Sequence, residues 1–110
     1  MAMPPPTAAG LADLDDLTAA VGAVHLVVRR PLCGCPAIWH AGGTPFVSLW
    51  GDDMVVRVAG GQLEAALGLP AAAMVEPTAG RRMNGWVRVP RSSSNDWHDL
   101  ARQAAATPLR

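Results

Sequence analysis

The chain of 110 residues contains no lysine, no tyrosine, one phenylalanine and two cysteines, and charged residues make up only 16% of it. All nine basic residues are arginine, a bias that a GC-rich genome explains. Nine acidic residues balance them, so the formal net charge is zero. This balance argues against general nucleic-acid binding, which depends on bulk positive charge.

Long apolar runs are also missing. No window approaches the roughly 20 apolar residues that a membrane span needs. The Met1–Gly10 segment is rich in proline and alanine, and it lacks the basic region and apolar run of a secretory signal. We therefore expect a cytoplasmic protein in a reducing environment, with no membrane partner.

The length is sufficient for one domain with one core. Half of the residues are hydrophobic, which favours a folded chain over a disordered one, although much of this fraction is alanine. We expect a mobile tail over residues 1–10 and a single domain over residues 11–107. Because the core is small, we also consider a homodimer whose interface would add to the stability of the fold.

Apolar spacing predicts the order of helices and strands. Leu11, Leu14 and Val21 recur at helical spacing, and the helix should end near Gly22. A second stripe begins at Trp97 and predicts a final helix. The expected strands cover residues 24–29, 37–40, 44–50, 54–59 and 85–89, with a short helix at 62–67 and a basic loop at 78–84. The turn at 51–53 should join two of these strands in an antiparallel hairpin.

The fold class that follows is α+β. We expect a small antiparallel sheet packed by an N-terminal and a C-terminal helix, with a short helix between strands.

Three segments resemble a known family. They are Asp52-Asp53-Met54-Val55-Val56-Arg57-Val58, then Gly80-Arg81-Arg82-Met83-Asn84-Gly85-Trp86-Val87, and Trp97 with Ala101 in the last helix. With this order of elements, the stretch from Leu11 to Ala105 resembles the TfoX N-terminal-like domain, which is related to MmcQ/YjbR proteins. The resemblance implies an antiparallel sheet packed by helices. It also implies a regulatory role related to competence or transcription, with DNA as a partner.

One segment departs from that family. Its members carry a Met-Phe-Gly-Gly-like segment after the first helix. Here the matching stretch is Pro31-Leu32-Cys33-Gly34-Cys35-Pro36, which keeps one glycine and loses the aromatic residue. No role is therefore carried over to this loop.

Arginines gather near the end of the chain. Arg81, Arg82, Arg88 and Arg91 occur in a stretch without acidic residues, and Arg57 would join Arg88 if their strands are neighbours. With Trp86 among them, these arginines could hold phosphates and stack on a base, or bind an acidic peptide. The alternative is a solvated face whose guanidinium groups pair with Asp52, Asp53 or Glu76.

Cys33, Cys35 and His40 are weak candidates for a metal site. Zinc sites usually have two to four residues between paired cysteines and a second ligand pair, whereas here one glycine separates the cysteines and no second pair follows. A disulfide across this spacing would be strained. We expect ordinary, partly buried cysteines with no metal and no cofactor.

Catalytic patterns are not assembled in the sequence. Ser48, His98 and Asp99 supply residue types used in hydrolysis, but no Gly-x-Ser-x-Gly elbow occurs. His98 and Asp99 are adjacent on a predicted helix and would point in different directions. We therefore predict that the protein is not an enzyme. The four tryptophans are expected to pack in a core between the sheet and the terminal helix.

The leading functional prediction is a non-enzymatic binding module with a regulatory role, with DNA or a protein as its partner. Arg57, Arg81, Arg82, Arg88 and Arg91, with Trp86, would form the contact. The alternative is a stand-alone protein-interaction or oligomerisation domain without nucleic-acid binding, in which an exposed edge strand pairs with a second copy.

Overall fold

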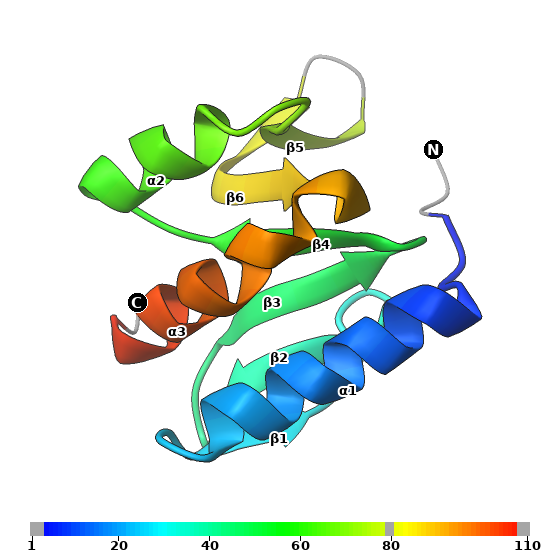
Figure 1. The fold of residues 1–110 in the computed structure, drawn as a ribbon, viewed down its shortest axis with the longest axis vertical. Helices are drawn as coiled ribbons and strands as arrows, with labels where there is room; N and C mark the ends of the chain where they lie inside the picture. Colours follow the sequence, from blue (N-terminus) through cyan, green and yellow to red (C-terminus); the bar gives the residue numbers. More distant parts are fainter. Residues whose placement is uncertain (1–3, 79–80, 108–110) are drawn as a thin grey trace.

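A computed structural model describes residues 4–78 and 81–107, with the backbone alone for residues 77, 78 and 81–84. Three α-helices and six strands follow one another along this part of the chain (Figure 1). Their order is α1 (Ala8–Gly22), β1 (Val27–Arg29), β2 (Ala37–His40), β3 (Pro45–Trp50), β4 (Asp53–Arg57), α2 (Gly60–Leu67), β5 (Ala73–Thr78), β6 (Arg81–Val89), the 3₁₀-helix η1 (Arg91–Asp96) and α3 (Trp97–Ala106).

The strands form one antiparallel sheet in the order β1-β2-β3-β4-β6-β5. The predicted hairpin is confirmed, since β3 and β4 pair across the turn at Gly51 and Asp52. The connection through α2 and β5 brings β6 back beside β4. The α+β class, with an N-terminal, a short middle and a C-terminal helix, is therefore confirmed.

Helix α1 begins earlier than the sequence pattern predicts. Thr7 is its N-cap, and the Thr7 hydroxyl accepts a hydrogen bond from the Gly10 N–H at 2.9 Å. The backbone before the helix also bonds to the β3–β4 turn, with Thr7 N–H donating to the Gly51 carbonyl at 3.0 Å. The helix therefore starts at Ala8 and not at the predicted Leu11, because a capping threonine and tertiary contacts extend it.

The predicted loop at 78–84 is also shorter than expected. Strand β6 begins at Arg81, and Thr78 of β5 pairs with Arg81 in the register of the two strands. The polar composition of this stretch favoured a loop, but antiparallel pairing with β5 continues the strand.

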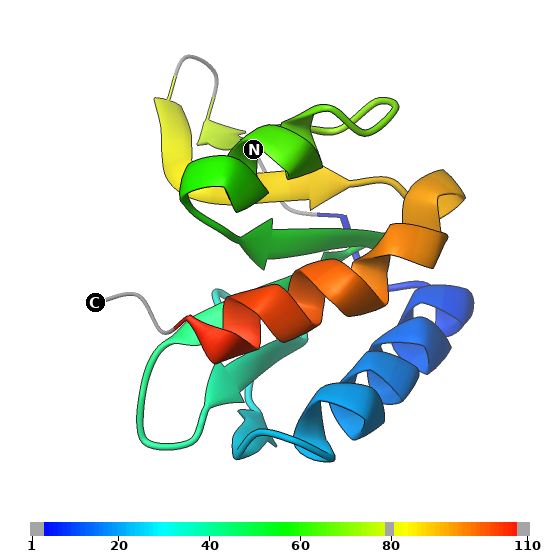
Figure 2. The same ribbon diagram turned by 60° about the vertical axis from the view of Figure 1, so that its left-hand side comes forward.

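All three α-helices lie on one face of the sheet. Helices α1 and α3 pack side by side over its centre, and α2 lies beside α3 near β6 (Figures 1 and 2). The core beneath them is built from apolar side chains of both layers. It includes Leu14, Leu17, Val21, Ile38, Val47, Leu49, Met54, Val56, Val87, Val89, Trp97 and Leu100. None of the helices in the described part of the chain is long and apolar enough to cross a membrane.

A second, smaller apolar cluster is separate from the main core. It contains Trp50, Trp86, Val55, Val75 and Cys35, and Leu32 packs against it. Strand alternation turns Trp50, Val55 and Trp86 away from the helices, so this cluster lies on the opposite face.

The tryptophans therefore do not meet in one core, and that prediction is wrong. Only Trp97 packs in the main core under the helices, whereas Trp50 and Trp86 lie in the second cluster. Trp39 is half-buried, and its indole N–H donates to the Arg30 carbonyl at 3.1 Å. Residue parity within each strand, rather than aromatic character, sets which face an indole occupies.

Candidate binding surface

Strands β4 and β6 bring two of the predicted arginines together. In their register, Arg57 lies opposite Trp86 and Val55 lies opposite Arg88. Residues two apart on a strand share a face, so Arg57, Trp86 and Arg88 all point away from the helices. We name this surface, defined by Arg57, Trp86 and Arg88, the arginine face.

Arg88 is held in place by two neighbours. Its Nε donates to Asp53 Oδ2 at 2.9 Å, and its guanidinium lies 5.7 Å from the centre of the Trp50 ring. The Arg88 side chain remains 40% exposed. A partly exposed pair of this kind contributes only about 0–1 kcal/mol, so an incoming anion can compete with Asp53 for the guanidinium.

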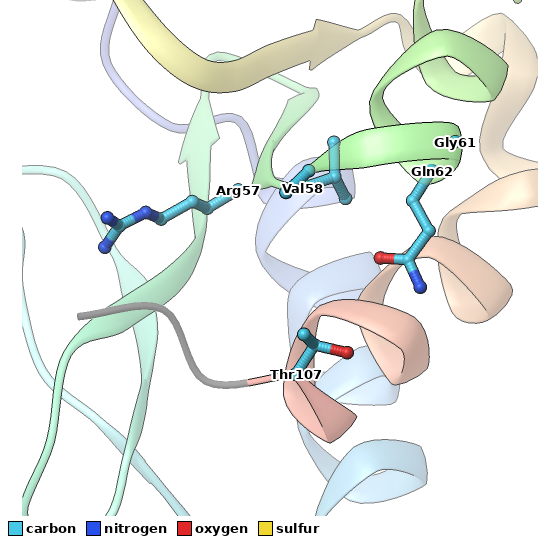
Figure 3. Close-up of a pocket in the computed structure, with 6 residues that line it drawn as sticks. Arg57, Val58, Gly61, Gln62 and Thr107 are labelled. Atoms are coloured by element: carbon cyan, nitrogen blue, oxygen red, sulfur yellow. The ribbon is translucent and has the colours of Figure 1, made fainter.

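Arg57 is the less constrained arginine of the face. Its side chain is half-buried, and it forms no ion pair or hydrogen bond with any residue that the structure describes. In Figure 3 the guanidinium extends away from Gln62 and Thr107. Arg57 is therefore available to bind an anion without breaking a contact to a described residue.

A hollow of about 420 Å³ lies next to the backbone of Arg57. Its described lining is Arg57, Val58, Ala59, Gly61, Gln62 and Thr107, and the Gln62 side chain extends toward Thr107 (Figure 3). Arg57 is the one titratable side chain among these described lining residues.

Trp86 exposes little of its surface on the arginine face. Only 7% of its surface is exposed, and it packs with Trp50, Val55 and Val75. The adjoining cavity measures about 50 Å³, far below the roughly 300 Å³ that ligand pockets begin with. The indole belongs to the apolar cluster on this face of the sheet, and its stacking role stays a prediction.

Arg91 does not belong to the arginine face. Its Nε donates to Asp13 Oδ2 of α1 at 2.8 Å, and its backbone N–H donates to Asp53 Oδ1 at 3.2 Å. The hydrogen bond to Asp13 raises the pKa of Arg91, with a further contribution from the charge of the same carboxylate. Arg91 therefore ties η1 to α1 instead of extending the predicted cluster.

Arg81 and Arg82 are the first two residues of β6. Their side chains lie outside the described residues, and the prediction that they join the cluster stays a prediction. Their strand is the one that carries Trp86 and Arg88.

The candidate metal ligands are separated by the fold. Cys33 and Cys35 occupy the turn before β2, whereas His40 ends that strand and contacts Phe46 with ring centres 4.5 Å apart. Within the described residues, no three histidine, cysteine or acidic side chains could hold a metal ion together. Cys33 is exposed and Cys35 is buried, and no disulfide joins the two.

Sequence reasoning missed the partners that orient the site. Asp13 is 78 residues from Arg91 in the chain, and no sequence pattern links the two. Gln62 and Thr107 are exposed to the hollow only because α2 and the end of α3 lie near the end of β4. The sequence does offer Asp53 as a partner for an arginine, and in the structure Asp53 pairs with Arg88.

No family description and no curated protein matches the chain.

Proposed function

We propose that this protein is a non-enzymatic binding module with a regulatory role that contacts an anionic macromolecule through the arginine face. The observation that carries the proposal is the register of β4 and β6, which puts Arg57 and Arg88 on one side of the sheet. Guanidinium groups bind phosphates and carboxylates through charge-assisted hydrogen bonds, and these are stronger than neutral ones.

DNA is the first candidate partner. Arg81 and Arg82 lie on the same strand as Arg88 and would add phosphate contacts if their side chains reach the same surface. The zero net charge and the Arg88–Asp53 pair limit the number of such contacts. We therefore expect weak and strongly salt-dependent DNA binding, and an acidic protein segment is the competing anion.

Fluorescence anisotropy with a short DNA duplex and with an acidic peptide, each at two salt concentrations, tests the proposal. Arg57→Ala should weaken DNA binding and reduce the salt slope by about one, since it removes one phosphate contact. The double variant Arg81→Ala/Arg82→Ala should reduce the slope by about one for each of the two side chains that contacts a phosphate.

Arg102→Ala is the matched control. Arg102 lies on α3, across the sheet from the arginine face, and pairs with Asp99 at 3.4 Å. Equal affinities for the Arg57 and Arg102 variants would refute the arginine face as the contact. Binding of the peptide but not of the duplex would assign a protein partner instead of DNA.

A protein-interaction or oligomerisation domain without nucleic-acid binding is the second candidate. It is favoured by two strongly exposed apolar side chains, Val24 at 73% and Leu26 at 85% exposure. Such residues next to a sheet edge are typical of a surface that pairs with another chain.

A further inference from the structure

The exposed apolar surface of the protein is concentrated at one edge of the sheet. Four large hydrophobic residues of the described chain are more than a third exposed, and three of them are Val24, Leu26 and Val28. They lie on β1 and the segment before it, and β1 is the outermost strand at that end (Figure 1). The fourth, Leu67, lies apart from them at the end of α2.

The two edges of the sheet differ in how they are protected. Strand β5, at the other end, contains Pro77, which has no N–H to donate, and its pairing with β6 has two register shifts. Proline and irregular pairing are devices that prevent an edge from recruiting another strand. Strand β1 has neither device, although it is short.

Backbone geometry identifies the groups that β1 offers. Ala41 N–H donates to the Leu26 carbonyl, and Arg30 N–H donates to the Ala37 carbonyl. Residues 26, 28 and 30 therefore direct their backbone groups toward β2. Antiparallel alternation turns the N–H and C=O of Val27 and Arg29 toward the open edge.

We propose that β1 pairs antiparallel with β1 of a second copy, with the twofold axis passing at Val28. This inference rests on the second candidate function above. In this register Val27 of each copy exchanges two hydrogen bonds with Arg29 of the other, so all the outward groups of both residues are satisfied. The two Val28 residues then lie directly opposite each other as a non-hydrogen-bonded pair.

The side chains suit the same register. Leu26 and Val28 share one face by strand alternation, so both copies contribute them to one apolar row. Leu26 lies opposite Arg30 of the other copy, whose guanidinium is already stacked 5.0 Å from the centre of the Trp39 ring and leaves its apolar stem for contact.

Charge does not oppose this pairing. Arg29 is bound to Asp15 of its own chain at 2.8 Å, and in the dimer it faces Val27, not another arginine. A shift of the axis to Val27 would place Arg29 opposite His25, whose N–H already donates to the Val21 carbonyl. Only the register with the axis at Val28 pairs the N–H and C=O of both Val27 and Arg29 without breaking an existing hydrogen bond.

Sedimentation velocity over a range of protein concentrations tests the dimer. A two-strand contact is at the small end of specific interfaces, so we expect a dissociation constant of about 10–100 µM. Val28→Arg would oppose two like charges across the axis and should raise this constant at least about tenfold. Leu26→Arg, at a side chain too exposed to affect the core, should weaken the dimer in the same direction. Leu67→Arg is the control and should leave it unchanged.

Cysteine trapping tests the register. In a Cys33→Ser background, Val28→Cys should form a covalent dimer on mild oxidation, because opposed residues of a non-hydrogen-bonded pair lie about 4.5 Å apart at Cα. Val27→Cys should not form one. A wild-type protein that stays monomeric, a dimer insensitive to both edge variants, or trapping at residue 27 instead of 28 would overturn the proposal.

Dimerisation and anion binding are measured independently. Loss of the dimer in Leu26→Arg with unchanged anion binding would leave the arginine face intact, and the reverse result for Arg57→Ala would leave the β1 interface intact.

Discussion

Replacing a glycine by alanine in the first turn of α1 and in the first turn of α2 should change the free energy of unfolding in opposite directions. Gly10 is the third residue of α1, and Gly61 is the second residue of α2. Neither has a positive φ, so alanine can adopt both backbone conformations. Replacing glycine by alanine at such positions stabilises a helix by about 0.5–1 kcal/mol, mainly by restricting the unfolded chain.

The surroundings of the two glycines differ. A Cβ on Gly10 would lie 2.7 Å from the Gly51 carbonyl oxygen and 2.9 Å from the Asp52 Cα, and both are backbone atoms of the β3–β4 turn. A Cβ on Gly61 would meet nothing within 4 Å. Overpacking against backbone costs about 1–3 kcal/mol, which exceeds the helix gain.

We therefore expect Gly10→Ala to lower the free energy of unfolding by about 1 kcal/mol and Gly61→Ala to raise it by about 0.5 kcal/mol. The difference between the two variants isolates the contact between α1 and the β3–β4 turn, because the helix-propensity contribution is nearly the same in both. Urea denaturation of both variants and the wild type, with the slope compared to confirm an unchanged unfolded state, measures this difference.

If Gly10→Ala proves as stabilising as Gly61→Ala, the close approach of α1 to the turn is absent. In that case two backbone hydrogen bonds would also be in question, since they depend on the same approach: Thr7 N–H donates to the Gly51 carbonyl, and Gly51 N–H donates to the Pro4 carbonyl.

Two further predictions concern titratable groups. Burial, with a smaller effect of the charge on His25, lowers the pKa of His40 below its usual 6.5. The unfolded chain then binds this proton more tightly than the folded one, so the free energy of unfolding should fall as the pH drops below about 6.5. His40→Gln should lose less stability than the wild type between about pH 7.5 and 5.5 in urea titrations, and equal losses would contradict the assignment. Burial, followed by the charge of Cys33, raises the pKa of the Cys35 thiol. Iodoacetamide at about pH 8 should therefore modify exposed Cys33 first, as peptide mapping by mass spectrometry would show, and equally fast labelling of Cys35 would contradict its burial.

Local patterns along the chain were enough to place most of the elements. The spacing of Leu14, Leu17 and Val21 predicts the buried side of α1, and the Gly51-Asp52 turn predicts the β3–β4 hairpin. The stripe that starts at Trp97 predicts the buried side of α3. These signals are reliable because each depends on neighbours within a few residues.

The arrangement of the candidate site depends instead on contacts between distant segments. Arg57 and Arg88 share a face because β6 returns beside β4 after α2 and β5. The sequence of neither strand alone determines the register of that pairing. Arg91 pairs with Asp13 because the fold places η1 near α1. Helical and strand periods specify which residues of a segment face the core. Strand order and register specify which charged side chains come close together, and in this protein the pairing of β4 with β6 brings Arg57 and Arg88 onto one face.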